Sequence, residues 1–336
     1  MNGVLFCLLC LTPLFQGGTA KTAVGPDDFR GWFLAASEHK LDIPKSIEEN
    51  ARRYRYVFIA GFSNERMPGY FAQNAKELRA LGVPRKAIHY VYPSSSKTVE
   101  ENLDEVHSKI VEIAGKGPER LVVIAHSRGA CDAMAFALHH KEFVEEHIQA
   151  LFLVQGPFGG TGVADFVTGE GPPMDCRMPW RYRMLGKLVG GMEKLLLKRG
   201  RHGGLTGMSR WVSRDYWTRS LEEHADAIPI VGPRTFYVTS ETTPSHLRFF
   251  KKATGAYLSA YFGPNDGMVS PDDQSLTGVG TVLAVLDAGH SDLTNRFPAA
   301  RADRNLRRAL IQGIVMAVGH EMPACQAPEP STETAP

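Results

Sequence analysis

Short apolar runs separated by helical segments recur along the chain, and this alternation restricts the fold more than any other feature. The runs have the length and the Val, Ile, Phe and Tyr content of β-strands. They cover residues 54–60, 88–92, 121–125, 151–155, 235–239 and 282–286. Helical patterns lie at residues 69–81, 99–114, 130–140 and 305–318. The alternation predicts an α/β fold with a mainly parallel sheet covered by helices on both faces.

The alternation is interrupted between about residues 156 and 231. This segment is rich in glycine, contains no strand pattern, and includes the basic stretch MPWRYRMLGKLVGGMEKLLLKRGR. We expect it to form a cap inserted over the sheet. Its mixture of cations and large apolar residues fits either a cap helix that packs on the domain or an amphipathic lid that touches an anionic lipid surface.

The two ends of the chain have a different character. Residues 1–20 combine a short apolar run with the small residues Gly18, Thr19 and Ala20, which predicts a signal peptide and a secreted or periplasmic protein. Residues 323–336 are rich in Pro, Glu and Thr and are predicted to be a disordered tail. The folded domain is therefore expected to span residues 21–322.

Charge and cysteine usage limit the possible partners and cross-links. The net charge is only +2, so nothing global points to nucleic acid. Three of the five cysteines remain after removal of the signal peptide. A pair between Cys176 and Cys325 is the more plausible disulfide, while Cys131 is expected to be a buried packing residue.

The segment LVVIAHSRGACDA, residues 121–133, predicts a strand, a sharp turn and a helix. Ser127 lies at the turn, where a strained backbone would project its hydroxyl above the sheet edge. Positions two before and two after such a serine approach each other closely, which explains Ala125 and Gly129. The helix N-terminus also directs backbone N–H groups at the site, as an oxyanion requires. We interpret Ser127 as a nucleophile.

A nucleophilic serine needs a base, and the base needs an acid that orients it. His290 follows the strand-like run TVLAVLD in the loop DAGHSDLT, beyond a strand end, where such sheets place their ligands. Asp266 precedes it in the loop FGPNDGMVSPDD, as the order Ser, Asp, His requires. The weaker carboxylate alternatives are Asp272, Asp273 and Asp287.

An oxyanion hole needs two N–H donors. Arg128 follows the nucleophile and would supply one. The turn after the first strand would supply the other, because Gly61 permits the bend and Phe62 presents its N–H.

These segments resemble the α/β-hydrolase superfamily, and more narrowly its bacterial secreted lipases and esterases. The resemblance is carried by VFIAGF, VVIAHSRGA, GPFGGTGVADF and GPNDGMVSP followed by AGHSDL. It extends over residues 54–315 and implies an α/β-hydrolase fold with a helical cap. Lipases of this group often hold calcium near the histidine loop through an Asp two residues after the His. Asp292 matches that position, but the expected second carboxylate would fall near His246, where no convincing ligand is present. Calcium is therefore possible but unsupported, and no other metal or cofactor is expected.

The resulting hypothesis is a serine hydrolase that cleaves a carboxylic ester, including a lipid, through Ser127, His290 and Asp266. An acyltransferase or thioesterase would use the same residues and differ only in the acceptor or leaving group. A non-catalytic lipid-binding module of the same fold is a different class, and it would have no need for all three side chains in this order.

Overall fold

The computed structural model describes residues 25–64, 67, 69–173, 175, 177, 180, 202–248, 250–294 and 304–320. The signal peptide, the C-terminal tail, the proposed Cys176–Cys325 pair and nearly all of the basic stretch of the cap lie outside these residues, so those expectations remain predictions.

Six parallel strands form one sheet in the order β2-β1-β3-β4-β5-β6. They are β1 (Arg55–Ile59), β2 (Ile88–Val91), β3 (Leu121–His126), β4 (Ile148–Val154), β5 (Thr235–Glu241) and β6 (Thr281–Asp287). All six predicted strands are confirmed, with boundaries that differ by a few residues. The largest shift is in β4, which was predicted to begin at residue 151 but begins at Ile148, because its first residues already pair with β3.

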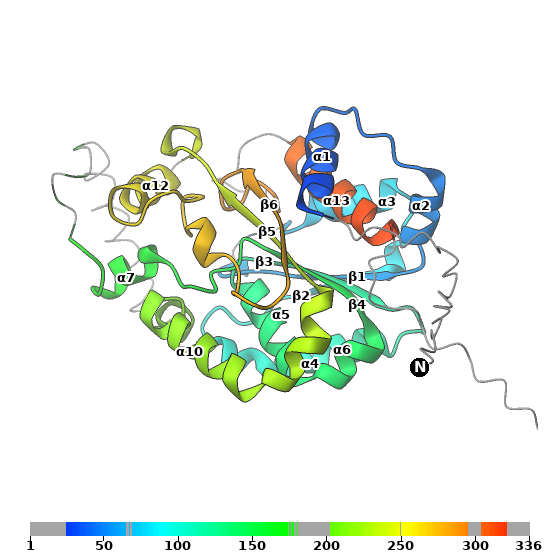
Figure 1. Ribbon diagram of the computed structural model, residues 1–336, viewed down its shortest axis with the longest axis horizontal. Coiled ribbons are helices and arrows are strands. Elements are labelled where there is room, and N and C mark those ends of the chain that lie inside the picture. Colours follow the sequence, from blue (N-terminus) through cyan, green and yellow to red (C-terminus); the bar gives the residue numbers. More distant parts are fainter. Residues whose placement is uncertain are drawn as a thin grey trace, which may run out of the picture.

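Helices cover both faces of this sheet (Figure 1). One face carries α1 (Pro26–Ser37), α2 (Lys45–Ala51), α3 (Ala72–Ala80) and α13 (Arg304–Gly319). The other carries α4 (Val99–Ala114), α5 (Arg128–His139), α6 (Lys141–His147), α10 (Arg210–Glu223) and α11 (Ile228–Val231). The other α-helices of the described residues are α7 (Gly162–Thr168), α9 (His202–Thr206) and α12 (Phe250–Tyr261). Short 3-10 turns are η2 (Arg85–Ala87), η3 (Ala225–Ala227), η4 (Gly232–Arg234), η5 (Pro244–His246) and η6 (Pro271–Asp273).

The core consists of two apolar layers, one on each side of the sheet. Alternate residues of a strand point to opposite faces. In β1, for example, Tyr56 and Phe58 join the layer under α1 and α13, whereas Val57 and Ile59 join the layer under α4 and α5. This alternation explains why the central strands are apolar at nearly every position.

The strand order reverses direction beside β1. The chain passes from β1 outward to β2 and then returns to form β3 on the other side of β1. In open parallel sheets, ligands bind in the crevice at the carboxyl ends of the strands where the order reverses. The loops after β1 and β3 meet at this point, and they contain Gly61 and Ser127.

The segment between β4 and β5 was predicted as a cap without strands. Its described residues contain helices and no strand, including the long helix α10. Sequence patterns did not reveal α10 because its buried stripe, Ser213, Trp217 and Ser220, is mostly polar.

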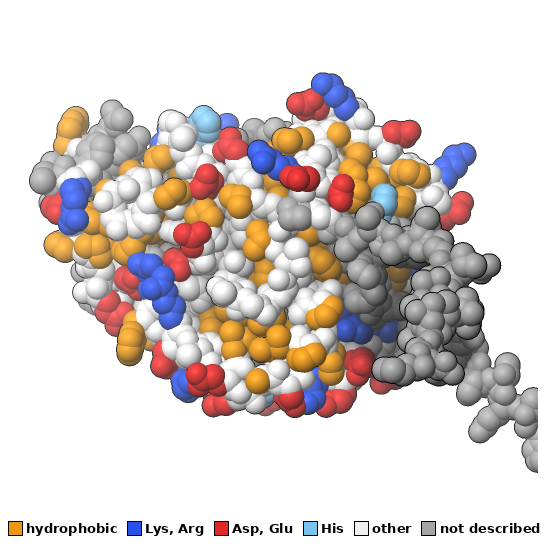
Figure 2. Space-filling model, in the orientation of Figure 1, with side chains coloured by type: hydrophobic (Ala, Val, Ile, Leu, Met, Phe, Trp, Pro, Cys, Tyr) orange, Lys and Arg blue, Asp and Glu red, His pale blue; other side chains and the backbone are white. Residues whose placement is uncertain are grey.

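Among the described residues, no helix combines the length and apolar character needed to cross a bilayer. On the face drawn in Figure 2, acidic and basic side chains are interspersed with small groups of apolar ones.

Candidate active site

Ser127 lies in a sharp turn between β3 and α5. Its backbone has φ 55° and ψ −134°, a conformation that residues with a side chain rarely adopt. Hydrogen bonds hold the turn: the Ser127 N–H donates to the Val154 carbonyl at 2.9 Å, and the Ser127 carbonyl accepts from the Ala130 N–H at 2.9 Å. The predicted strand, turn and helix are therefore present, with the serine at the carboxyl end of a central strand.

The small residues around Ser127 are required by close backbone approach. A Cβ atom on Gly129 would lie 2.5 Å from the Ala60 carbonyl oxygen, and one on Gly61 would lie 2.8 Å from the Ser127 Cβ. Real Cβ contacts are essentially never this short. Any larger side chain at either position would move β1 away from the serine turn.

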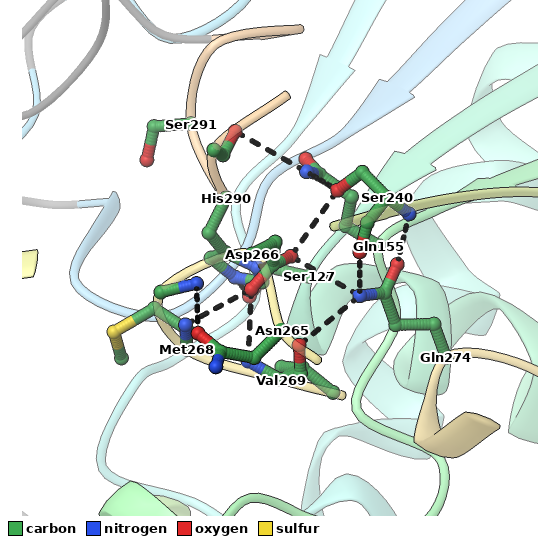
Figure 3. Close-up of polar contacts among 12 residues, drawn as sticks. Ser127, Gln155, Ser240, Asn265, Asp266, Met268, Val269, Gln274, His290 and Ser291 are labelled. Atoms are coloured by element: carbon green, nitrogen blue, oxygen red, sulfur yellow. Dashed lines mark hydrogen bonds and ion pairs between the residues drawn. The ribbon is translucent and has the colours of Figure 1, made fainter. Parts of the chain in front are cut away.

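The His290 imidazole lies between Ser127 and Asp266 (Figure 3). Its Nδ1 is 2.8 Å from the Asp266 Oδ2, and its Nε2 is 2.8 Å from the Ser127 Oγ. An ionised carboxylate can only accept, so the proton sits on Nδ1 and leaves Nε2 free to accept from the serine hydroxyl. The structure thus brings together the three side chains that the sequence singled out, in an order suited to removing a proton from Ser127.

The acid loop, residues 265–269, fixes the orientation of the Asp266 carboxylate. Its Oδ1 accepts from the N–H groups of Met268 at 2.9 Å and Val269 at 2.8 Å. Its Oδ2 also faces the Gln274 amide, with an N–O distance of 3.3 Å, and the Ser240 hydroxyl, with an O–O distance of 3.5 Å. Asp266 is fully buried. These donors stabilise the ionised carboxylate without a formal cation in direct contact.

His126 supports residues 289–292, the histidine loop, by a hydrogen bond to its backbone. Its Nε2 lies 2.7 Å from the His290 carbonyl and 3.0 Å from the Gln155 Oε1, so this nitrogen donates. Its Nδ1 then accepts from the Tyr70 hydroxyl at 2.5 Å. Burial, with the nearby His290 as a smaller cause, lowers the pKa of His126 well below its ordinary value. A neutral imidazole is what this pair of partners requires.

Gln155 connects three strand ends at the site (Figure 3). It has a left-handed backbone with φ 53°. Its side-chain amide donates to the Ser240 hydroxyl and, at 3.3 Å, to the Gly289 carbonyl. Gln155, His126 and Ser240 were not predicted from the sequence as site residues. The sequence signal for Gln155 was its polar side chain at the end of the apolar run of residues 151–155.

The predicted oxyanion donors lie next to the serine turn. Arg128 is the first residue of α5, and Phe62 follows Gly61 in the loop after β1. That loop is shaped by Asn64, whose amide donates to the Gly61 carbonyl at 3.1 Å and to the Pro93 carbonyl at 2.8 Å. Their assignment as oxyanion donors remains a proposal.

The Arg128 side chain has structural partners outside the triad. It is buried, donates to the Ser94 carbonyl at 3.0 Å and pairs with Asp132 at 3.7 Å. Burial raises the pKa of Asp132 to about 6, although Arg128 acts in the opposite direction. The hydrogen bond to Ser94 therefore ties the start of α5 to the loop before α4, whereas the ion pair lies within the first turns of α5.

The alternative carboxylates have other partners. Asp273 pairs with Arg214 at 2.9 Å and with Arg210 at 3.6 Å. Asp287 is exposed at the end of β6 and accepts from the Thr242 hydroxyl at 2.5 Å. Asp272 lies in the same short turn as Asp273. Of the four candidate carboxylates, Asp266 is the one bonded to His290.

The residues around Asp292 fit a calcium ion poorly. The Asp292 Oδ2 accepts from the Gly289 N–H at 2.9 Å, and the buried ammonium of Lys251 interacts with the Asp292 charge. A calcium ion needs several oxygen ligands and would be repelled by this ammonium. The described residues contain no group of three or more His, Cys, Asp or Glu side chains placed to hold a metal ion.

Comparisons with known proteins bear on the fold. No protein-family model matches the sequence, and no curated protein is similar to it at a significant level. The structure of the mature form of Bacillus licheniformis lipase BlEst2 is similar with a TM-score of 0.51 and 16% identity, over 71% of this chain and 85% of that chain. The metagenomic carboxyl esterase MGS0156 is similar with a TM-score of 0.54 and 15% identity, over 81% of this chain and 76% of that chain.

These likenesses agree with the parallel sheet and the helices on both of its faces. The chain has the α/β-hydrolase fold.

Proposed function

We propose that the protein is a serine hydrolase that cleaves carboxylic esters through an acyl-enzyme. The observation that carries the proposal is the continuous hydrogen-bonded chain from Ser127 to His290 to Asp266, with both links at 2.8 Å, built around a serine in a strained turn. A binding module would have no use for a base bonded to a serine and oriented by a buried carboxylate.

In the first half of the reaction, the Ser127 Oγ attacks the ester carbonyl carbon while His290 Nε2 accepts the hydroxyl proton. Asp266 holds the reactive tautomer and stabilises the imidazolium that forms. The tetrahedral intermediate collapses when the C–O bond to the alcohol breaks, and His290 returns the proton to the departing oxygen. The acyl group remains on Ser127.

The negative oxygen of the intermediate would be stabilised by the N–H groups of Phe62 and Arg128. The positive end of the α5 helix dipole would add to this stabilisation. One such donor typically lowers the barrier by about 3 kcal/mol. The proposed chemistry uses side chains and backbone amides of the chain, with no added metal ion or cofactor.

In the second half, water attacks the acyl-enzyme with His290 as the base, and the acid is released. A thioesterase would differ in the first leaving group, and an acyltransferase would replace water with another acceptor. Rates on p-nitrophenyl esters from acetate to palmitate, with and without an emulsion, and on the matching acyl thioesters would rank these substrates. Added alcohols would test transfer to another acceptor.

The proposal is tested with Ser127→Ala and the matched control Ser37→Ala, which changes a serine at the end of α1. A fluorophosphonate probe should label the wild-type protein and Ser37→Ala but not Ser127→Ala. Ester hydrolysis should fall by at least about 10³-fold in Ser127→Ala alone. Labelling that persists in Ser127→Ala, or a wild-type protein without esterase or thioesterase activity, contradicts the proposal.

We further propose a secreted or periplasmic location, on the basis of the predicted signal peptide, and peripheral contact with a lipid surface through the basic cap. Two exposed tryptophans support the second point: Trp180 is 72% exposed and Trp211, on α10, is 77% exposed. Tryptophan favours the interface between water and lipid.

A further inference from the structure

Lys251 is a buried lysine beside the histidine loop. It lies in the first turn of α12, and only 3% of its surface is exposed. Its Nζ donates a hydrogen bond to the Ser291 Oγ at 2.5 Å. Lysine is almost never fully buried without a partner, because removal of the ammonium from water is costly. The partner here is the residue that directly follows His290.

Two carboxylates stabilise the charge of Lys251. Asp266 belongs to the acid loop and Asp292 to the histidine loop, and both favour the ammonium form. Burial acts more strongly in the other direction, so the pKa of Lys251 falls to about 8. The charge of Lys251 also helps to lower the pKa of His126, on the far side of the histidine loop.

The histidine loop is a tight turn that Asp292 closes. The Asp292 N–H donates to the Gly289 carbonyl at 2.8 Å, and the Asp292 carboxylate accepts from the Gly289 N–H at 2.9 Å. The Asp292 carbonyl accepts from the buried Arg307 of α13 at 3.2 Å. His290 lies inside this turn, so the position of the turn determines the position of the imidazole.

The helix that carries Lys251 also contacts the acid loop. The Thr254 hydroxyl, one turn after Lys251, donates to the Gly267 carbonyl at 2.5 Å. A Cβ atom on Gly267 would lie 3.4 Å from the Lys251 Cβ. Leu247, just before α12, packs against both Gly267 and Gly289. The start of α12 is therefore a shared support for the two loops that hold Asp266 and His290.

We propose that Lys251 is a positioning residue for the hydrolysis described above: its buried ammonium holds the histidine loop against the acid loop, so that His290 stays between Asp266 and Ser127. This inference rests on the proposed function. The family resemblance suggested calcium as the positive charge beside Asp292. The inference assigns that charge to the Lys251 side chain instead. Lys251 itself touches no reacting atom.

A consequence is that activity and stability should change in opposite directions as Lys251 loses its proton. The ammonium form is needed for positioning, so kcat should fall above about pH 8, the pKa of Lys251. Folding depresses this pKa from its ordinary value of 10.5. The unfolded chain therefore binds more protons between these two values, and the contribution of Lys251 to stability rises with pH over that window. The titratable groups that interact with Lys251 are the carboxylates of Asp266 and Asp292 and the neutral imidazole of His126.

The test compares Lys251→Met, which removes the charge but keeps the length, with Lys251→Arg, which keeps the charge. Lys252→Met is the matched control, because Lys252 is the next residue of α12 and is only partly buried. Steady-state kinetics on a short soluble ester, from about pH 6 to about pH 10, would give kcat and KM for each variant, and urea unfolding would give stability. Fluorophosphonate labelling of Ser127 would report on the nucleophile itself.

We expect Lys251→Met to lose about 10- to 100-fold in kcat, the usual effect of a small misplacement of a reacting group, with KM changed by less than about threefold. It should also lose the decline in kcat above pH 8. Because the cost of burying the ammonium outweighs its attraction to the two carboxylates, this variant should unfold at an equal or higher urea concentration than wild type near neutral pH. Lys251→Arg should retain more activity than Lys251→Met, and Lys252→Met should match wild type in all respects.

A Lys251→Met variant with wild-type kcat, or with the same alkaline decline, overturns the inference. So does an activity loss that Lys252→Met shares or that follows a loss of stability. If Lys251→Met does not fold, Ser291→Ala replaces it: loss of the acceptor should lower the pKa of Lys251 and move the alkaline decline to lower pH, and an unmoved decline rejects the inference. A wild-type protein that the fluorophosphonate does not label rejects the proposed function, which is a separate result.

Discussion

Asp266→Asn gives the most demanding test of the proposed mechanism, because the surroundings of this side chain fix how the new amide must lie. The Oδ1 position accepts from two backbone N–H groups, those of Met268 and Val269. An NH₂ group there would face two donors, so the amide oxygen must take this place. The NH₂ group then faces His290 Nδ1, the atom that Asp266 holds at 2.8 Å in the native protein.

This orientation traps the wrong tautomer of His290. Because the NH₂ group donates, Nδ1 must accept, and the imidazole proton moves to Nε2. That nitrogen can no longer accept the proton of Ser127, 2.8 Å away. In addition, the NH₂ group replaces an oxygen that faces the donors of Gln274 and Ser240. We expect kcat to fall by about 10⁴-fold, equivalent to about 5 kcal/mol of transition-state stabilisation, since the geometry is kept and the base is lost.

The assay is the initial rate on p-nitrophenyl acetate near neutral pH, combined with the rate of fluorophosphonate labelling. Asp287→Asn and Asp273→Asn are the matched controls, because both carboxylates bond to groups other than His290. Each should retain activity within about threefold of wild type. If Asp266→Asn stays within about tenfold of wild type, or if a control variant is the inactive one, the assignment of the acid is wrong.

Three further predictions concern the serine turn, His126 and the cap. Gly61→Ala should reduce kcat at least tenfold and lower Tm, because its Cβ would lie 2.8 Å from the Ser127 Cβ. The control Gly31→Ala should raise Tm slightly, because a Cβ at that position would have no atom within 4 Å. Thermal unfolding and ester kinetics would check both variants. The pKa of buried His126 lies below its ordinary value of 6.5, so wild-type stability should fall as pH drops below about 6.5, and urea unfolding of His126→Asn should show a weaker pH dependence in that window. Vesicle co-sedimentation at low salt should be weaker for a variant in which four cap cations are changed to Gln, with hydrolysis of a short ester unchanged, because each cation near an anionic surface contributes about 1 kcal/mol. The cations are Arg181, Arg183, Lys187 and Lys194.

The sheet and the serine turn could be predicted because their causes are local. A strand at the centre of a parallel sheet is buried on both faces, so it appears in the sequence as an uninterrupted apolar run. The turn at Ser127 requires Gly129 and Gly61 by contacts that the structure shows to be shorter than any side chain allows. Asp266 and His290 were found by the order of residues along the chain and by their positions after strands.

Helix α12, which supports the acid and histidine loops, was harder to predict, because packing rather than periodicity determines its composition. In α12, Gly255 lies in the middle of the helix, where glycine lowers helix propensity. The structure gives the reason: a Cβ on Gly255 would lie 2.4 Å from the Leu247 side chain that supports both loops. A residue that weakens the local pattern is needed for the tertiary contact.

The polar support of the site could not be predicted because its partners are distant in the sequence. His126 and the carbonyl of His290 are 164 residues apart, and Gln155 and Ser240 are 85 residues apart. No local spacing encodes such pairs. They become neighbours only because β3, β4, β5 and the histidine loop end at the same edge of the sheet.

Lys251 shows where reasoning from sequence stops. Lys252 follows it directly, so the sequence shows two adjacent lysines and gives no sign of which one is buried. The rotation of one residue along α12, about 100°, separates a buried ammonium bonded to Ser291 from a partly buried lysine. That difference in orientation is also what makes Lys252→Met a fair control, because the two variants change the same charge in the same turn of the helix and differ in what the ammonium touches.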